Sequence, residues 1–347
     1  MTLQFAVSSR PSTTMTSSTW RMSTTTLATI LLFVLPSFGT SLPVSYECPG
    51  DDANAEDAKN KTRSWNTWAD FGSLHEEILT NMTEYLKTFR DSEFDANSFT
   101  YNEYKDAMRP FKSRYFSKHL QGKENPTLYE SAHGVGMNLL MTLEILEEQG
   151  IEGVNVYGNE YVDASTIKAR HVLDSLPVAN SSRGMICTAD STDLSFVPEE
   201  AFDVVYTGYI SPIINPLGFT SPSQDENYAS YRKLCQATED DREKIQLRDT
   251  AQRIQNDWYG KWVGEMVRIA KPGGAVIVEQ IAVPYCECYI DWGGVPQSFW
   301  KETLQNNTYG WDVDPDSLVI ELDTMYVKRY HVAMVKKQGF VGEDEIS

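Results

Sequence analysis

The sequence predicts an α/β fold with a doubly wound, mostly parallel sheet, and three observations support that prediction. Short β-branched runs alternate with helical patterns along residues 125–341. A glycine turn separates the first of these runs from its helix, and an acidic residue follows the second run. In such a sheet the carboxyl ends of the parallel strands share one edge, and ligands bind at that edge.

The first strand, 125–130, leads into a turn that can approach a ligand. The turn contains an acidic residue, an alanine, a histidine and two glycines: Glu130, Ala132, His133, Gly134 and Gly136. Glycines let the backbone fold tightly, and the helix that follows, 137–149, begins with unpaired N–H groups. An acidic residue at the head of the turn suits a cationic ligand better than a pyrophosphate.

The second strand, 154–158, is followed by Glu160. Glu160 comes about 24 residues after Gly136, close to the spacing at which an acidic side chain binds the ribose of a nucleotide cofactor. The sequence therefore predicts that Glu160 accepts hydrogen bonds from two ribose hydroxyls.

Three later segments continue the pattern. Residues 186–196 carry Asp190 and Ser191 after a third strand, 202–207 form a fourth strand ending at Thr207, and 266–279 combine a helix, a Pro-Gly-Gly turn and a fifth strand. With the E-x-A-x-G-x-G turn, these segments resemble the class I S-adenosylmethionine-dependent methyltransferases, whose first motif is an acidic residue followed by G-x-G-x-G. The resemblance covers roughly residues 125–337 and is strong because four signatures occur in family order.

The resemblance implies a seven-stranded Rossmann-like sheet that ends in an antiparallel pair, 318–322 and 329–335, and S-adenosyl-L-methionine as the cofactor. It also implies that Asp190 faces the adenine amino group. Ala132 replaces the first glycine of the family motif, which is a mild departure. The residues expected to bind the cofactor are Glu130, Ala132, His133, Gly134, Gly136, Glu160, Asp190, Ser191 and Thr207.

The start of the chain has the features of a targeting segment. The first 46 residues contain no Asp or Glu, and an apolar run occupies 27–35. We expect residues 1–42 to be a leader that directs the chain into the secretory pathway and is then cleaved, with no stable membrane span afterwards. A signal anchor and a bipartite plastid leader are the alternatives.

Between the leader and the cofactor-binding domain, 125–341, we expect a polar linker, 43–65, and an N-terminal helical cap, 66–124. An insertion at 209–243 follows the fourth strand, where insertions shape substrate pockets. N-glycosylation sequons, used if the chain enters the endoplasmic reticulum, begin at Asn60, Asn81, Asn180 and Asn306.

The five cysteines are too few and too irregularly spaced for a disulfide scaffold or a zinc cluster, and we expect mostly structural thiols and no metal. They are Cys48, Cys187, Cys235, Cys286 and Cys288.

The formal net charge of −19 disfavours nucleic acid as a substrate, because an acidic surface repels phosphates. The expected partner is a small-molecule methyl acceptor with an O, N or S nucleophile, and the oligomeric state is left open. Methyl transfer needs mainly alignment and desolvation, sometimes with a base. Tyr209 and Glu279 are the candidate catalytic residues, since both follow strands at the ligand edge. His133 and His331 are more plausible as packing residues.

Two alternative functions remain. One is an NAD(P)-linked Rossmann oxidoreductase, which also needs a glycine turn and an acidic residue after the second strand. Such a site does not require Glu130, Asp190 or the Pro-Gly-Gly turn. The other is a catalytically silent S-adenosylmethionine-binding protein of the same fold.

Overall fold

The computed structural model describes residues 43–49, 101–174, 181–208, 216–221, 224–287, 293–325 and 328–339. All of these belong to one compact unit, Leu42–Ser347. The expected leader, most of the linker and the first part of the helical cap lie outside the described residues. Tyr209, Cys288 and three of the sequon asparagines also lie outside them: Asn60, Asn81 and Asn180.

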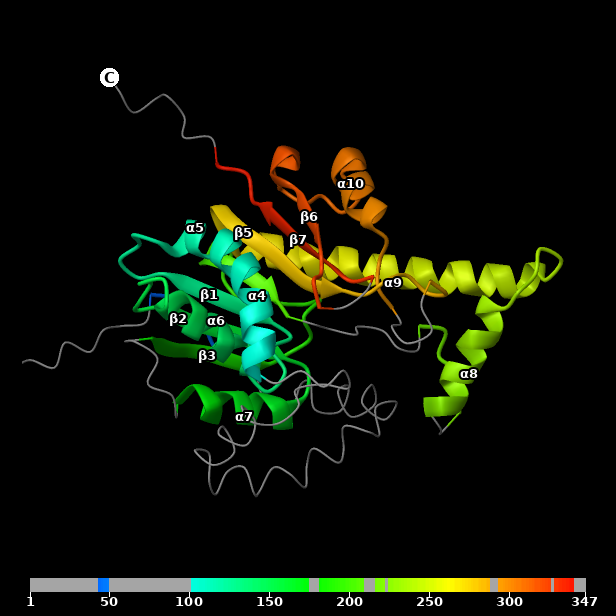
Figure 1. The fold of residues 1–347 in the computed structure, drawn as a ribbon, viewed down its shortest axis with the longest axis horizontal. Helices are drawn as coiled ribbons and strands as arrows, with labels where there is room; N and C mark the ends of the chain where they lie inside the picture. The colour runs from blue at the N-terminus through cyan, green and yellow to red at the C-terminus, as the bar shows by residue number, and fades with distance from the viewer. Residues whose placement is uncertain are drawn as a thin grey trace, which may run out of the picture. The chain divides into compact units, whose positions relative to one another are not determined.

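A seven-stranded sheet with the order β3-β2-β1-β4-β5-β7-β6 organises the described chain (Figure 1). The strands β1 to β5 pair in parallel, and β7 is antiparallel to both β5 and β6. This arrangement confirms the predicted mostly parallel sheet and its antiparallel closing pair. The strands are β1 (Thr127–Ser131), β2 (Asn155–Glu160), β3 (Ser182–Thr188), β4 (Phe202–Thr207), β5 (Ala270–Ile281), β6 (Val319–Leu322) and β7 (Tyr330–Val335).

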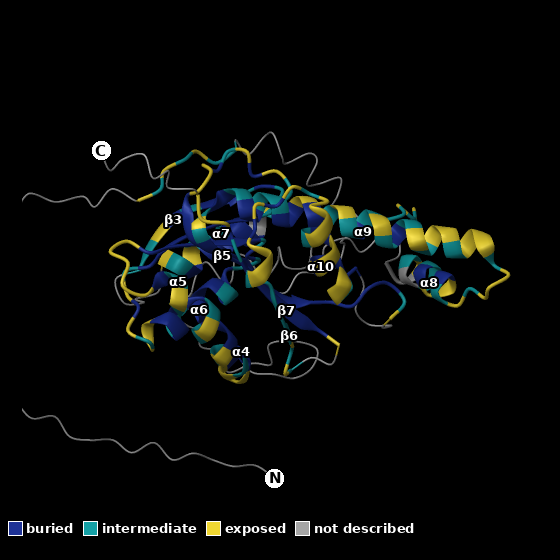
Figure 2. Ribbon diagram, turned by 90° about the horizontal axis from the view of Figure 1, so that it is seen from above, coloured by how far each residue is buried: buried dark blue, intermediate teal, exposed yellow. Residues whose placement is uncertain are grey.

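Helices cover both faces of the sheet, as a doubly wound fold requires. Helices α4, α6 and α7 contribute to one apolar cluster, and α9 and α10 contribute to the other. Figure 2 shows the strands as buried between them. The helices are α4 (Tyr101–Tyr115), α5 (Ser117–Leu120), α6 (Met137–Glu147), α7 (Asp163–Asp174), α8 (Gln224–Cys235), α9 (Arg242–Ile269) and α10 (Gln297–Asn306), with a short 3₁₀ turn at Pro315–Ser317.

The alternation of side chains along β5 explains why both faces are apolar. Ala275 and Ile277 pack into the first cluster, whereas Val276 and Val278 pack into the second. Successive side chains of a strand point to opposite faces, so a strand buried on both sides is apolar at every position. Glu279 and Gln280 end this apolar run at the ligand edge.

The described part of the helical cap, α4 and α5, packs on the first face. Tyr104, Met108, Phe111 and Phe116 are all buried there. The cap aromatics that the structure describes therefore serve mainly as core residues.

Two disulfides correct the expectation of mostly unpaired structural thiols. Cys48 is bonded to Cys187 and Cys235 to Cys286. The partners are 139 and 51 residues apart in sequence, so their pairing depends on the tertiary fold and leaves no recognisable local spacing. The first bond ties the segment 43–49 to β3, and the second ties α8 to the loop after β5.

The described part of the predicted insertion, 216–221 and 224–243, packs around its own small core. Tyr231 of α8 stacks on Tyr285, with ring centroids 5.6 Å apart, and Phe219 packs edge-on against Tyr231 at 4.9 Å. The Tyr231 hydroxyl accepts a hydrogen bond from the Leu217 amide, 2.8 Å away. The insertion is thus fixed against the segment that follows β5.

Within the described ranges, no helix has the length and apolar character needed to cross a membrane. The same ranges hold no group of three or more His, Cys, Asp or Glu residues placed to bind a metal ion.

Candidate cofactor site

The turn after β1 has the backbone conformation that the glycine motif predicts. Gly134 and Gly136 have φ values of +56° and +82°, and Ala132 has φ +57°. A non-glycine residue in this left-handed region costs about 1 kcal/mol, so Ala132 keeps the glycine conformation at some energetic cost. A Cβ on Gly136 would lie 3.0 Å from the Cβ of Ala169 in α7, which requires glycine there, whereas a Cβ on Gly134 would meet nothing within 4 Å.

Glu160, at the end of β2, is joined to this turn. Its Oε2 accepts a hydrogen bond from the Gly134 amide at 2.9 Å, and its Oε1 accepts one from the Val162 amide at 3.0 Å. Burial raises the pKa of Glu160, although these amides partly oppose that shift. A carboxylate has about four acceptor positions, so roughly two remain for ligand hydroxyls. The structure therefore brings Glu160 and the glycine turn together.

His133 packs between the turn and β2. Its Nδ1 lies 2.8 Å from the Gly134 carbonyl oxygen, and a Cβ on Gly158 would come within 2.9 Å of its Cδ2. Burial lowers the pKa of His133 to about 4, so the ring is neutral at pH 7. The Nδ1 proton is then donated to the carbonyl, and His133 serves as a packing residue of the turn.

The ends of β2 and β3 are cross-linked by a residue that sequence reasoning missed, Asn159. Its buried amide nitrogen donates to the Ala189 carbonyl at 3.1 Å and to Ser191 Oγ at 2.9 Å. Asp190 accepts hydrogen bonds from the Thr192 amide and hydroxyl, at 2.9 and 2.8 Å. Glu160, Asp190 and Ser191 are thus held at neighbouring strand ends. A polar residue inside a strand was the only sequence signal for Asn159.

Glu130, the acidic head of the turn, is buried beside the ends of β4 and β5. Its Oε1 accepts a hydrogen bond from Asn138 Nδ2 at 2.6 Å, and its Oε2 lies 3.1 Å from the Tyr206 hydroxyl. Asn138 Nδ2 also lies 3.2 Å from Glu279 Oε2. A Cβ on Gly208, after Thr207 at the end of β4, would be 2.6 Å from Asn138 Nδ2. The Asn138 amide therefore donates to two carboxyl groups, and it has room to do so because Gly208 has no side chain.

Burial raises the pKa of Glu130 to about 8, although hydrogen bonds from Asn138 and Tyr206 and the charge of Lys112 oppose that shift. The Tyr206 hydroxyl donates to Glu130 Oε2 at 3.1 Å and also lies 3.2 Å from Thr142 Oγ1, and the Thr142 hydroxyl donates to the Asn138 carbonyl at 2.7 Å. The carboxyl group of Glu130 is therefore held by two donors and is protonated more readily than an exposed glutamate.

Glu279 forms an ion pair that the sequence did not reveal. Lys112 Nζ of α4 lies 2.6 Å from Glu279 Oε1, and both side chains are fully buried. The ammonium also lies 4.8 Å from the Phe116 ring centroid and 4.9 Å from that of Tyr206. One oxygen of Glu279 is thus engaged by Lys112 and the other by Asn138. Its expected role as a base stays a prediction, as does that of Tyr209.

His331 is a packing residue on β7, as expected. Its Nδ1 accepts the Gln280 amide proton at 3.0 Å, and its ring packs against the Phe111 ring at a tilt of 31°, with centroids 4.5 Å apart. Gln280 has φ +49°, which turns its side chain toward α4, where its Oε1 accepts from the Tyr104 hydroxyl at 2.5 Å.

No protein-family model and no curated protein sequence matches the chain. Similar solved structures include magnesium protoporphyrin IX methyltransferase from Synechocystis PCC 6803 with bound S-adenosylmethionine, at 9% identity over 77% of this chain and 96% of that chain, with a TM-score of 0.40. The YcgJ protein from Bacillus subtilis has 12% identity over 66% of this chain and 100% of that chain, with a TM-score of 0.37.

A third similar structure is a Listeria monocytogenes protein assigned to the class I S-adenosylmethionine-dependent methyltransferases. It has 16% identity over 68% of this chain, with a TM-score of 0.41, and this chain spans 61% of its length. At these identities the similarity concerns the fold alone.

Proposed function

We propose that the chain is an S-adenosylmethionine-dependent methyltransferase that acts on a small-molecule acceptor. The observation that carries the proposal is the hydrogen bond from the Gly134 amide to Glu160 at the carboxyl edge of the sheet. This bond joins Glu160 to a turn that begins with the acidic residue Glu130. A cation bound beside Glu130 favours the ionised form of its carboxyl group, so the turn suits a sulfonium or an ammonium group, whereas an ionised Glu130 would repel a pyrophosphate. The net charge of −19 also favours a cationic or neutral ligand over nucleic acid.

The residues at this edge fit the parts of the cofactor. Glu160 would accept the ribose hydroxyls, Asp190 and Ser191 would flank the adenine, and Glu130 would stand beside the cationic end. When bound, the cofactor supplies a methyl group on a good leaving group. The chain then has to orient the acceptor, exclude water and, where needed, take up a proton. A catalytically silent relative would bind the cofactor without methyl transfer, so a panel of acceptors separates these two functions.

Replacing Glu160 by alanine should weaken the binding of S-adenosylhomocysteine by about 2 to 3 kcal/mol, or roughly 30- to 150-fold, because charge-assisted hydrogen bonds are lost. Titration calorimetry on the full chain measures this change. Glu152→Ala is the matched control, since Glu152 is exposed and precedes β2 at the opposite edge of the sheet. An unchanged affinity in a folded Glu160→Ala protein would remove Glu160 from the site.

We further propose that the chain enters the secretory pathway. Two disulfides support this, because disulfides form and persist in oxidising compartments. The sequon at Asn306 supports it as well, since Asn306, Asn307 and Thr308 are all exposed at the end of α10. An acidic-poor leader of about 42 residues agrees with the same route.

For a protein secreted by eukaryotic cells, we expect mass spectrometry to find an N-linked glycan at Asn306, Cys48 and Cys187 joined, and an N-terminus near residues 40–42. Asn306→Gln should lose that glycan, whereas Asn307→Gln, which keeps Asn306 and Thr308, should retain it. A reduced Cys48 and an unmodified Asn306 in the protein isolated from its native cells would contradict this route.

A further inference from the structure

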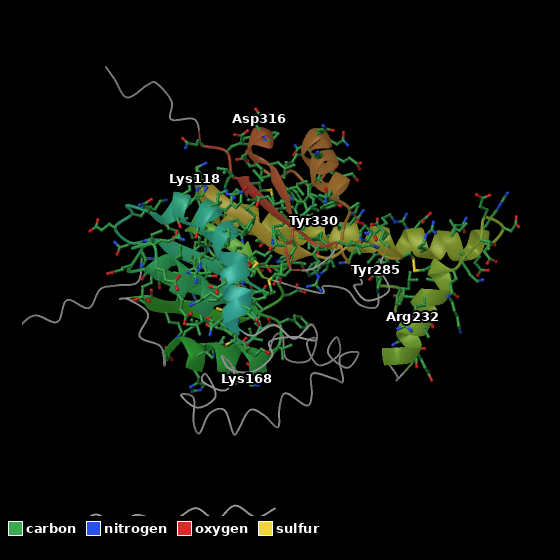
Figure 3. All side chains as sticks on the ribbon, viewed as in Figure 1. Lys118, Lys168, Arg232, Tyr285, Asp316 and Tyr330 are labelled. Atoms are coloured by element: carbon green, nitrogen blue, oxygen red, sulfur yellow. A yellow bond between two sulfur atoms is a disulfide. The ribbon has the colours of Figure 1, made fainter. Side chains whose placement is uncertain are left out.

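Glu130 belongs to a buried cluster of charged side chains at the carboxyl edge of the sheet. Its carboxyl group and that of Glu279 both accept from the Asn138 amide, at 2.6 and 3.2 Å. Helix α4, the cyan helix that crosses in front of the strands in Figure 3, brings Lys112 to within 2.6 Å of Glu279. Glu130, Glu279 and Lys112 are each no more than 1% exposed. The cluster therefore combines two carboxyl groups with one ammonium group.

The other described side chains around Glu130 bring no second positive charge. Tyr206 of β4 donates to Glu130 at 3.1 Å, and the charge of Glu130 acts on Tyr104 of α4. Burial raises the pKa of both hydroxyls well above the usual value, so both are neutral at pH 7. Burial lowers the pKa of His133, in the same turn, to about 4, so this ring is neutral as well. On β2, the residue paired with Glu130 is Gly158, which has no side chain.

The charges of the cluster do not balance when both carboxyl groups are ionised. Lys112 neutralises Glu279, and nothing comparable neutralises Glu130. Asp323 and Arg329, which also act on Tyr104, carry opposite charges and add nothing to the balance. Since a buried charge without a counter-charge is costly, Glu130 has to hold a proton or face a positive charge from outside the chain. Burial raises the pKa of Glu130 to about 8, which is the direction that this charge balance requires.

We propose that Glu130 distinguishes S-adenosylmethionine from S-adenosylhomocysteine, by giving up its proton when a sulfonium is bound and regaining it when the sulfur is neutral. The proposal rests on the proposed function, which puts the cationic end of the cofactor beside Glu130. The two ligands differ by one methyl group and one positive charge, and they share their amino and carboxylate groups. Only the sulfonium can therefore supply the missing charge in one complex and not in the other.

The attraction between a sulfonium and Glu130 acts through space, so it requires no contact with the buried oxygens. Asn138, which covers one of them, is itself only partly buried. Two charges about 6 to 8 Å apart, at an effective dielectric constant of about 20, change an equilibrium constant roughly 30- to 100-fold. The proton passes to solvent when the sulfonium binds and returns from solvent after methyl transfer, so the carboxyl group is unchanged over a turnover.

The preference for S-adenosylmethionine should therefore grow as pH rises. At pH 6 most of the free protein carries the Glu130 proton, which has to be removed before the sulfonium is favoured. At pH 8.5 most Glu130 is already ionised, because its pKa is about 8. We expect the ratio of the dissociation constants, S-adenosylhomocysteine over S-adenosylmethionine, to be at least about tenfold larger at pH 8.5 than at pH 6.

Calorimetric titration of the full chain with each ligand at both pH values measures this ratio. Glu130→Gln cannot ionise, so its ratio should change less than about threefold as much as the ligands themselves allow. The amino groups of the ligands titrate in the same range, but they do so with both proteins, and the comparison with Glu130→Gln removes their contribution. Glu147→Gln is the matched control and should behave as the wild type, since Glu147 is exposed on the same helix as Asn138.

Proton release gives a second measurement that does not depend on the affinities. It is obtained by titrating at pH 7.5 in two buffers that differ in ionisation enthalpy. On binding S-adenosylmethionine, the wild-type protein should release about half a proton more than Glu130→Gln, because its carboxyl group ionises. On binding S-adenosylhomocysteine, the two proteins should release equal numbers of protons.

The outcomes separate this inference from the proposed function. If both ligands bind the wild-type protein but their ratio varies with pH no more than in Glu130→Gln, Glu130 does not distinguish them, and only this inference is overturned. Equal proton release by the two proteins on binding S-adenosylmethionine would overturn it as well. If neither ligand binds the wild-type protein at either pH, the proposed function fails and takes this inference with it.

Discussion

Replacing Lys112 by methionine should lower the free energy of unfolding by about 3 to 5 kcal/mol, because the substitution leaves Glu279 buried without its counter-charge. The two side chains are fully buried and 2.6 Å apart, so solvent cannot compensate for the loss. Denaturant unfolding of the wild-type and variant proteins at pH 7 measures the difference. The effect should be among the largest of any single substitution in the described chain.

Two further variants make that result specific. Lys105→Met removes an ammonium on the same helix that pairs with Glu144 at 3.1 Å in a partly exposed position, and it should cost no more than about 1 kcal/mol. The double variant Lys112→Met, Glu279→Gln should recover most of the stability, because no buried charge is left unpaired. If Lys112→Met costs no more than Lys105→Met, the buried pair does not exist in solution.

The double variant also tests the expected catalytic role of Glu279. If the recovered protein still transfers methyl groups, neither the Glu279 carboxylate nor its ion pair is needed for turnover, and Glu279 is not the base. If the protein is stable and binds the cofactor but has lost turnover, Glu279 takes part in the chemistry.

Replacing Glu130 by glutamine should stabilise the protein at pH 8 and leave its stability unchanged at about pH 4 and below. The pKa of Glu130 is about 8 in the folded protein, against 4.5 when exposed, so the unfolded chain loses its proton first as pH rises. Each pH unit between these values favours the unfolded wild-type chain by about 1.4 kcal/mol. Glutamine cannot ionise, so its advantage should grow through this window to several kcal/mol and then level off.

Asp203 supplies a control with the opposite sign. Burial acts to raise the pKa of Asp203, but hydrogen bonds from Lys123, Thr127 and Lys271 outweigh it and lower the pKa. Its contribution to stability is therefore present above about pH 4 and lost as pH falls further. Asp203→Asn should destabilise the protein at pH 7, with a smaller effect in stronger acid. If the change in stability caused by Glu130→Gln does not vary with pH, the pKa of Glu130 is not raised in the folded protein.

The parts of the site that follow from local sequence were predictable. The alternation of strand and helix predicts where the glycine turn and Glu160 lie. Because both follow neighbouring parallel strands, Glu160 reaches the Gly134 amide. The conformation of Ala132 was also implied by its place in the motif, because the backbone there is left-handed whichever residue occupies it.

The parts that depend on distant contacts were not predictable. Lys112 and Glu279 are 167 residues apart, and nothing in the pattern of α4 distinguishes the buried Lys112 from the more exposed Lys105. Tyr206 lies on an apolar strand, where an aromatic residue indicates core packing, yet its hydroxyl donates a hydrogen bond to the buried carboxyl group of Glu130. The burial of Gln255 was not predictable for a similar reason, since a single polar residue in a helical pattern is normally exposed.

The most direct test of the central claim is a calorimetric titration of the full chain with S-adenosylhomocysteine and, separately, with NADH. Both ligands have a ribose that Glu160 could bind, but only NADH carries a pyrophosphate, for which the turn headed by Glu130 offers no cationic side chain. The account predicts saturable binding of S-adenosylhomocysteine with one site per chain and no measurable binding of NADH. Binding of NADH alone would contradict it.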